Sequence, residues 1–299
     1  NEDETMRITL DGHTAQSVNE LYVSFNEVPT RSDHDFSFPN PFTSDQAITV
    51  PEVQIGQYYL LAYGSTLSGS EQDVDLKAEI IPFQISDVDA EEGGNTGNVT
   101  LRIDGAKFTA DMELRLFDAT LGEVVAHTLI YVNSTRVFAT FNLAGEALGI
   151  YDVVAEKSSP AATTSLVDGF EIVAGGAGTT TSGSGGGGFF CNIVNVGTDQ
   201  NLQKNIAHPA SIRVNRVAPI NIQFGNDGNV DIACPTRWLI SLRGAPIAFT
   251  VDGLEEGKQE LFLNFMELGG PPGILRPGSY SSITVYAYSS HPMRFVLRE

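Results

Sequence analysis

Apolar and polar residues alternate in short runs along the whole chain, and no run has the length and period of an amphipathic helix. Alternation with a period of two predicts strands that bury one face, and closely spaced turns predict antiparallel pairing. In residues 5–80, clusters of Asp, Gly, Ser and Pro separate the runs. The strands predicted there are MRITL (6–10), NELYVSF (19–25), AITV (47–50), YYLLAYG (58–64) and VDLKAEI (74–80).

Residues 81–173 continue this pattern as a second unit, in which a Gly/Asn-rich turn follows the first strand. Turn-forming residues again divide the alternating runs, so we expect a second antiparallel sandwich. Its strands are predicted within IIPFQISDV (80–88), VTLRIDGAKFTADMELRLFD (99–118), VVAHTLIYV (124–132), RVFATFNL (136–143), GIYDVVAEK (149–157) and LVDGFEIV (166–173).

Residues 174–188, AGGAGTTTSGSGGGG, hold eight glycines, no charge and no side chain larger than Thr. Such a composition cannot form a core and predicts a flexible linker. A third set of strand-length runs follows the linker. They lie within FFCNIVNVG (189–197), SIRVNRVAPINIQFGNDGNVDI (211–232), TRWLISLRG (236–244), IAFTV (247–251), QELFLNFMEL (259–268), SSITVYAYS (281–289) and MRFVLRE (293–299).

The patterns together predict an all-β chain of three antiparallel β-sandwich domains in series, of immunoglobulin-like or jelly-roll-like topology. We expect the first domain at 1–80, the second at 81–173 and the third at 189–299. The linker at 174–188 separates the last two domains.

Charge is distributed unevenly along the chain. Residues 1–188 carry 28 acidic and 8 basic side chains, and residues 189–299 carry 9 of each, so the net charge of −20 lies in the first part. An acidic surface repels nucleic acid and anionic lipid, and the sequence has no basic run. It also has no long apolar span and no signal-peptide pattern at NEDETMRITL, which predicts a cytosolic chain or part of a longer, processed protein.

Two of the units carry segments that resemble known bacterial domains. In the first, LYVSF (21–25), ITVP (48–51) and GQYYLLA (56–62) resemble the pre-peptidase C-terminal domain, a small β-sandwich attached to secreted enzymes and surface proteins. In the second, the segments resemble immunoglobulin-like domains of the plexin and transcription-factor type, as bacterial surface proteins carry them. Those segments are ISDV (85–88), GNVTLRIDG (97–105) with Phe108 after it, GIYDVV (149–154) and DGFEIV (168–173).

The third unit resembles the cell-adhesion-related immunoglobulin-like domains of bacteria and archaea. RVAPINIQFGNDGNVD (216–231) matches a strand and turn of these domains, and LRPGS (275–279) before ITVYAY matches their late Pro-Gly turn. The three resemblances imply a secreted or surface-displayed protein whose sandwiches act in adhesion or spacing.

The only two cysteines, Cys191 and Cys234, fall in the third unit, 43 positions apart. In an oxidising compartment one disulfide between them would close a loop of that size and stabilise the fold by about 3–4 kcal/mol. The alternative is a pair of buried thiols. No C-x-x-C motif is present, so neither a structural zinc site nor a redox motif is predicted.

Motifs for catalysis are absent from the sequence. It has no G-x-S-x-G and no phosphate-binding loop with lysine, and its five histidines show no metal-ligand spacing. We therefore expect no enzyme, no catalytic residue and no cofactor other than calcium.

Calcium is the one metal that the acidic residues favour, because Asp and Glu supply hard oxygen ligands and D-x-D points two carboxylates to one side of a strand. The best candidate is Asp87, Asp89, Glu91 and Glu92, at the junction of the first two units. SDHDF with Asp33 and Asp35, and DVD with Asp73 and Asp75, are weaker candidates. None has the twelve-residue calcium-loop pattern, so the alternative is solvated loop acids.

Aromatic residues are the candidates for glycan contacts. Tyr58 and Tyr59 are adjacent in one strand, and Trp238 is the single tryptophan. Sugars stack on exposed rings, whereas a tryptophan in an alternating strand such as TRWLI is more often part of the core. We expect Trp238 to lie in the core of the third sandwich.

The sequence thus predicts a non-enzymatic extracellular segment that acts as a spacer and as an interaction module for surface proteins or polysaccharide. Two alternatives remain open. One is a filament subunit that donates MRITL or MRFVLRE to a neighbouring subunit, because unpaired sheet edges recruit strands. The other is a carbohydrate-binding accessory region of a secreted hydrolase.

Overall fold

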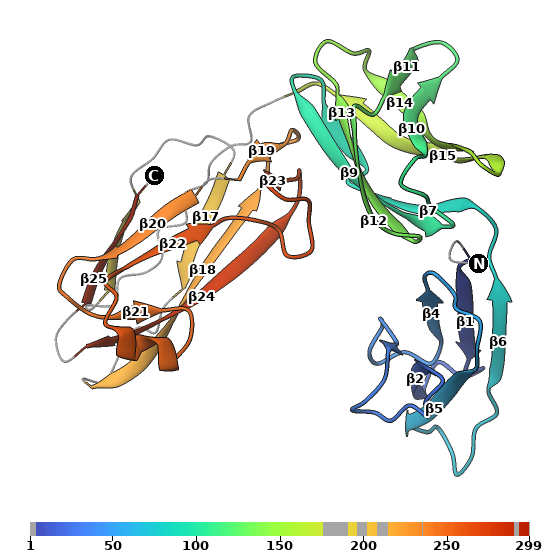
Figure 1. Ribbon diagram of the computed structural model, residues 1–299, viewed down its shortest axis with the longest axis horizontal. Coiled ribbons are helices and arrows are strands. Elements are labelled where there is room, and N and C mark those ends of the chain that lie inside the picture. Colours follow the sequence, from blue (N-terminus) through green and yellow to red (C-terminus); the bar gives the residue numbers. More distant parts are fainter. Residues whose placement is uncertain are drawn as a thin grey trace. The chain divides into compact units, whose positions relative to one another are not determined.

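The computed structural model describes residues 4–175, 191–195, 202–207, 215–234, 236–289 and 293–298. The described residues form β-sheets, which confirms the predicted all-β class, and their one short helix is a 3-10 turn, η1 (Asp252–Glu256) (Figure 1). By packing, the chain divides into two compact units. Unit 1 comprises Asn1–Asp89, Arg102–Ala139 and Tyr151–Gly169, and unit 2 comprises Ala90–Leu101, Thr140–Ile150 and Phe170–Glu299.

The first six strands form two three-stranded sheets, ordered β4-β1-β6 and β3-β2-β5. Five of the six overlap the predicted strands, and β3 was not predicted. Six buried apolar residues from β1, β2 and β4 form the core of this sandwich. The strands are β1 (Met6–Asp11), β2 (Val18–Phe25), β3 (Phe36–Ser37), β4 (Gln46–Val50), β5 (Tyr58–Thr66) and β6 (Asp75–Ile80).

The next nine strands form a five-stranded sheet, β11-β10-β14-β15-β8, and a four-stranded sheet, β12-β13-β9-β7. Most of these strands overlap the predicted segments, but β8 lies in none of them. They are β7 (Gln84–Asp89), β8 (Glu92–Gly94), β9 (Asn98–Ala106), β10 (Glu113–Asp118), β11 (Gly122–Val125), β12 (Thr128–Asn133), β13 (Arg136–Asn142), β14 (Gly149–Ser158) and β15 (Ala161–Val173).

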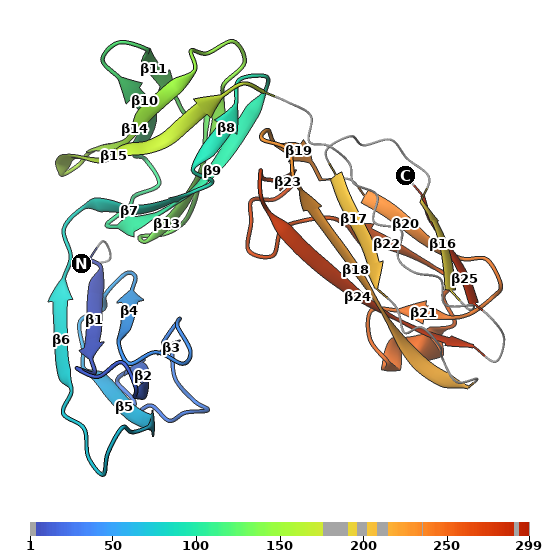
Figure 2. The ribbon, with the colours of Figure 1, turned by 180° about the vertical axis from the view of Figure 1, so that it is seen from behind.

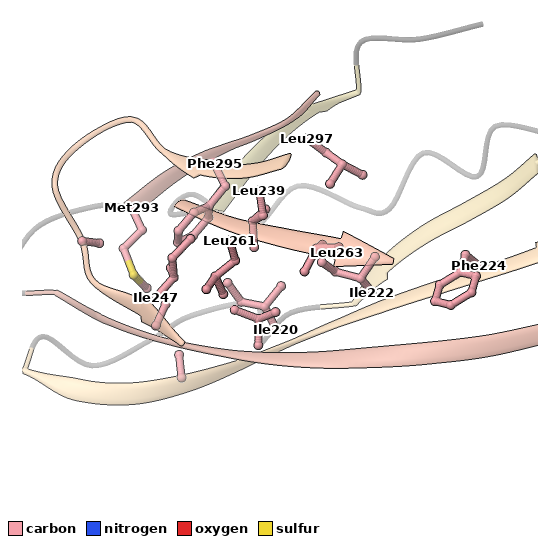
Figure 3. Packing of buried hydrophobic residues seen from close by; sticks show 14 of the residues in the cluster. Ile220, Ile222, Phe224, Leu239, Ile247, Leu261, Leu263, Met293, Phe295 and Leu297 are labelled. Carbon is pink, nitrogen blue, oxygen red and sulfur yellow. The ribbon is translucent and has the colours of Figure 1, made fainter. Parts of the chain in front are cut away.

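The remaining strands form the sheets β16-β25-β20-β22 and β17-β18-β24-β21, with a small sheet β19-β23. Apolar side chains of the two large sheets fill the space between them, as Figure 3 shows for Ile220, Leu239 and Phe295. The strands are β16 (Cys191–Asn195), β17 (Leu202–Ala207), β18 (Arg216–Asn226), β19 (Ile232–Ala233), β20 (Thr236–Ser241), β21 (Ile247–Ala248), β22 (Glu260–Asn264), β23 (Ile274–Leu275), β24 (Tyr280–Ser289) and β25 (Met293–Arg298).

Parallel strand pairs occur in the described part of the chain, where the sequence predicts antiparallel sheets throughout. β8 pairs with β15, and β16 pairs with β25 (Figure 2). Parallel neighbours need a long crossover connection, and in both cases several strands separate the two partners. Local alternation and turn residues do not reveal such a pairing.

Within unit 1, buried hydrogen bonds connect the residues before β1 to the strands after β6. The hydroxyls of Thr5 and Ser134, both fully buried, lie 3.3 Å apart. The backbone N–H of Lys107 donates to Thr5 Oγ1 at 3.1 Å, and the N–H of Glu52 donates to Ser134 Oγ at 3.0 Å. A buried polar group that loses its hydrogen-bond partner is left unsatisfied, at a cost in free energy. The hydrogen bonds among these four residues therefore stiffen unit 1.

Within unit 2, the loop after β18 contacts the end of β8 and the start of β9. The N–H of Gly94 donates to the carbonyl of Asn229 at 2.6 Å, and the N–H of Asp231 donates to the carbonyl of Asn98 at 2.8 Å. The predicted linker 174–188 lies outside the described residues except for Ala174 and Gly175. The carbonyl of Ala174 accepts a hydrogen bond from Asn229 Nδ2 at 3.1 Å.

Candidate binding site

A groove of about 1100 Å³ opens at one end of the last sandwich and is the main candidate site in the described part of the chain. β18 and β24 form one wall, and the segment that follows β22 forms the other. The lining is mostly apolar, with uncharged amides and hydroxyls. Its polar and aromatic members include Gln223, Asn264, Glu267, Tyr280, Ser281 and Ser282.

The groove runs along a part of β24 that has a strand partner on one side. β18 pairs with β24 over Tyr280–Ser289, whereas β21 pairs with it at Tyr286 and Ala287 alone. Among the described residues, no strand occupies the second side of β24 next to the groove. Large apolar side chains line the opposite wall, and Leu268 is 93% exposed. A ligand can therefore contact both apolar groups and hydrogen-bonding groups here.

The ring of Tyr280 is held in place by a glycine. Gly225 is the residue opposite Tyr280 in the β18–β24 pair. A Cβ atom on Gly225 would overlap the Tyr280 ring and would come within 2.9 Å of the Ser279 carbonyl oxygen. Only glycine therefore allows the ring to lie over β18 in this way. Tyr280 is 66% exposed, so the groove presents a positioned aromatic ring to solvent.

An ion pair fixes the wall of the groove that follows β22. Arg276 donates from Nε to Glu267 Oε2 at 2.8 Å and from an Nη atom to Glu267 Oε1 at 2.6 Å. The Arg276 side chain is 2% exposed and that of Glu267 is 15% exposed. A two-point pair with this burial holds both side chains in one geometry. The wall is thus preorganised for binding.

Trp238 does not lie in the core, so that prediction is wrong. In β20 the buried residues are Arg237, Leu239 and Ser241, and Trp238 points to the opposite face, where it is 39% exposed. It stacks edge-on against Phe262 of β22, with ring centroids 4.6 Å apart. Phe262 is also exposed, and Asn264, two residues further along β22, lines the groove. Trp238 is therefore available for contacts, as the glycan prediction requires.

Of the other two glycan candidates, Tyr58 is less exposed than Trp238, and Tyr59 is about as exposed as Trp238. The hydroxyl of Tyr58 accepts a hydrogen bond from the N–H of Gln54 at 3.0 Å, and its ring packs against the core of the first sandwich. Tyr59 points to the other face of β5, is partly exposed, and donates its hydroxyl to Gln57 Oε1 at 2.7 Å. The two rings do not share one surface, because neighbouring residues of a strand face opposite sides.

Two of the four calcium candidates, Asp87 and Asp89, lie beside the positively charged side chain of Arg102. The guanidinium of Arg102 lies 3.1 Å from Asp89, 3.9 Å from Asp87 and 3.1 Å from Asp104. Glu91 and Glu92 lie beyond β7, and Glu92 begins β8. Among the described residues, no three or more His, Cys, Asp or Glu side chains are grouped to hold a metal. Calcium binding at these four acids stays a prediction.

The Cys191–Cys234 disulfide stays a prediction, because the side chain of Cys191 lies outside the described residues, and Cys234 is a free thiol in the described part of the chain. β16 begins at Cys191 and pairs with β25, whereas Cys234 follows β19, which pairs with β23. Cys191 therefore begins a strand of one sheet, and Cys234 lies in the segment between β19 and β20. Cys234 packs against the core, and burial together with the charge of Glu267 raises the pKa of its thiol to about 11.

Sequence patterns did not reveal the groove, because its residues come from positions 223–224, 264–272 and 280–283. The uncharged segment GGPPG after Leu268 was the one available signal, since such loops often form exposed walls. Sequence patterns also did not reveal the role of Asn226, which is fully buried. Its side chain donates to the carbonyls of Val230 and Leu275 and so shapes the neighbouring loop.

No known protein family matches the sequence, and no curated protein matches it. Among the solved structures that are similar to the chain, two align over its whole length. One is a marsupial T cell receptor, with 8% identity, a TM-score of 0.24 and 93% of the receptor chain covered. The other is the BSP domain of a biofilm-associated protein, with 6% identity, a TM-score of 0.22 and 60% of that chain covered. These TM-scores are too low to support an argument about function.

The described residues contain no helix that is long and apolar enough to span a membrane.

Proposed function

We propose that the chain is a non-enzymatic structural and adhesive segment of a prokaryotic surface or secreted protein. Its sandwiches act as a spacer, and the last one binds polysaccharide in the groove beside β24. The observation that carries this proposal is the combination of a mostly apolar groove, whose one lining acid is paired with Arg276, with aromatic rings that face solvent. The spacer role draws on the buried hydrogen bonds within each unit, which resist bending.

The chemistry of the groove suits a neutral glycan. A sugar ring has an apolar face of C–H groups and a rim of hydroxyls, and it therefore needs aromatic and hydrogen-bonding groups side by side. Tyr280 supplies a ring, and Gln223, Asn264, Ser281 and Ser282 supply amides and hydroxyls. The only acid in the lining, Glu267, has its carboxylate engaged by Arg276. The groove therefore offers little to a strongly charged ligand.

The experiment is a binding screen of the full chain against immobilised polysaccharides. We expect retention on at least one neutral polysaccharide. Trp238→Ala should weaken retention, because Trp238 packs against Phe262 of β22, and the last residue of β22, Asn264, lines the groove. Phe249→Ala is the matched control, since Phe249 is an exposed ring of the same sandwich outside the groove. Equal retention of all three proteins, or no retention at all, would argue against the proposal.

The filament alternative requires a strand that can leave its own sheet. β1, which contains MRITL, lies between β4 and β6, and β25, which contains MRFVLRE, lies between β16 and β20. Both proposed donor strands are therefore already paired on both sides. Donation would require two ladders of hydrogen bonds to break, so this geometry favours the spacer and adhesion proposal.

A further inference from the structure

The first sandwich is open along one margin. Leu60 of β5 is 38% exposed, and Leu76 and Ile80 of β6 are 46% and 51% exposed. These residues do not belong to the outer faces of their sheets. Leu60 is the register partner of Val23, Leu76 that of Leu10, and Ile80 that of Met6.

Directly paired residues point to the same face, and Val23 and Leu10 belong to the core of this sandwich. Leu60, Leu76 and Ile80 therefore point into the space between the two sheets. The opposite margin is closed, because β4 contacts both β2 and β3 and its Ile48 and Val50 are buried. The sandwich thus has a covered side at β3 and β4 and an uncovered side at β5 and β6.

The open margin is bordered by two strand edges. Among the described residues, β5 pairs with β2 alone and β6 pairs with β1 alone. Each edge carries a row of backbone N–H and C=O groups that another extended backbone can satisfy. A small molecule could cover the apolar side chains, but it could not continue a ladder of alternating donors and acceptors. The geometry therefore fits an added strand.

The charge around this margin indicates what kind of strand would be added there. The turn between β5 and β6 and β6 itself carry four acids and one base. They are Glu71, Asp73, Asp75, Glu79 and Lys77. The chain as a whole has a net charge of −20, so a second copy would be repelled on approach.

We propose that the open margin of the first sandwich accepts an extended strand from a partner protein, with apolar residues at alternate positions and basic residues between them. The apolar residues would cover Leu60, Leu76 and Ile80, and the basic residues would lie near the acids of β6. This site is in unit 1 and is independent of the groove beside β24, so each proposal can fail without the other.

The test uses the full chain and a short synthetic peptide that alternates valine with lysine and threonine. We expect saturable binding, measured by fluorescence anisotropy, and new amide protection in β5 or β6 in hydrogen exchange. Leu76→Gln should weaken binding about tenfold or more, because it puts a polar group into the apolar margin. Lys77→Gln is the matched control on the outer face of β6 and should change affinity less than about twofold.

Three results would overturn the proposal. The first is no binding of the peptide to the intact chain, and the second is equal weakening by Leu76→Gln and Lys77→Gln. The third is self-association of the chain in sedimentation that Leu76→Gln abolishes, because the occupant would then be a second copy. A scrambled peptide of the same composition, without alternation, should bind more weakly if a strand is added. Melting curves of both variants check that the fold is retained, since Leu76 and Lys77 are both exposed.

Discussion

The carboxylate of Asp231 accepts two hydrogen bonds from Thr100, one from the backbone N–H at 2.9 Å and one from the hydroxyl at 2.6 Å. The two residues are 131 positions apart in the sequence and belong to the same compact unit. The Thr100 hydroxyl also lies 2.8 Å from that of Thr140. Thr100 is fully buried, so this carboxylate is the partner that its N–H would otherwise lack.

We predict that Asp231→Ala lowers the free energy of unfolding of unit 2 by about 1.5–3 kcal/mol, the usual range for hydrogen bonds to a charged group. Hydrogen exchange at the Thr100 amide should become faster at the same time. The control is Asp111→Ala, which removes an exposed acid from a turn. Unchanged exchange at Thr100 in Asp231→Ala would show that the contact does not persist in solution.

A second prediction concerns the pair of Arg276 and Glu267. Arg276→Met should destabilise the last sandwich by about 3–5 kcal/mol, because it leaves the Glu267 carboxylate in a largely buried place without its partner. The double variant with Glu267→Leu should recover most of the loss, since an apolar pair can replace a buried ion pair. Chemical denaturation measures both values. A double variant less stable than Arg276→Met would contradict this account.

The third prediction concerns pH and the first sandwich. The Glu20 carboxylate accepts hydrogen bonds from Arg31 at 2.7 and 2.8 Å and from the Tyr22 hydroxyl at 2.7 Å. The hydrogen bonds from Arg31, and after them that from Tyr22, hold the pKa of Glu20 below its ordinary value of 4.5. The pair therefore stabilises the fold fully above pH 4.5, and this contribution is lost as the pH falls through the lowered pKa.

Denaturation across this pH range should show a loss of stability on acidification that is smaller in Glu20→Gln. The variant has no carboxylate at this position to protonate, so part of the pH dependence should disappear. If both proteins lose stability in parallel, Glu20 does not contribute to the acid sensitivity of the fold.

A fourth prediction concerns Cys234. Its thiol has a pKa of about 11 against an ordinary value of 9.0, so the thiolate fraction at pH 8 is about a hundredfold lower than for an ordinary cysteine. Labelling of Cys234 in the folded chain should be correspondingly slow and should accelerate on unfolding. The Cys191→Ser variant isolates the Cys234 signal. In the unaltered chain, absence of both thiols before unfolding that reductant reverses, or a melting temperature that falls with reductant, would instead support the predicted disulfide.

The strands were predictable because period-two alternation is a local property, and most of the predicted segments overlap observed strands. Which face of a strand is buried was not always predictable. In TRWLI the alternation allows burial either of Trp238 or of Arg237 and Leu239, and the structure buries the second pair. Likewise, Leu60 and Leu76 look like core residues in the sequence, but both are exposed, on strands that are sheet edges in the described part of the chain.

The candidate site could not be predicted, because it depends on contacts between distant residues. The placement of Tyr280 depends on the absence of a side chain at Gly225, 55 positions earlier. The short reach of β21 along β24 also depends on pairing between separate segments. Composition did predict the neutral character of this part of the chain, which holds equal numbers of acids and bases.

The most direct test of the central claim is a titration of the full chain, its Tyr280→Ala variant and its Phe249→Ala variant with an oligosaccharide from a polysaccharide that retains the chain. The account predicts that Tyr280→Ala weakens binding about tenfold or more, since loss of a stacked aromatic group costs more than about 1.4 kcal/mol. Phe249→Ala should bind like the unaltered chain. Equal affinities for all three proteins would contradict the assignment of the groove as the binding site.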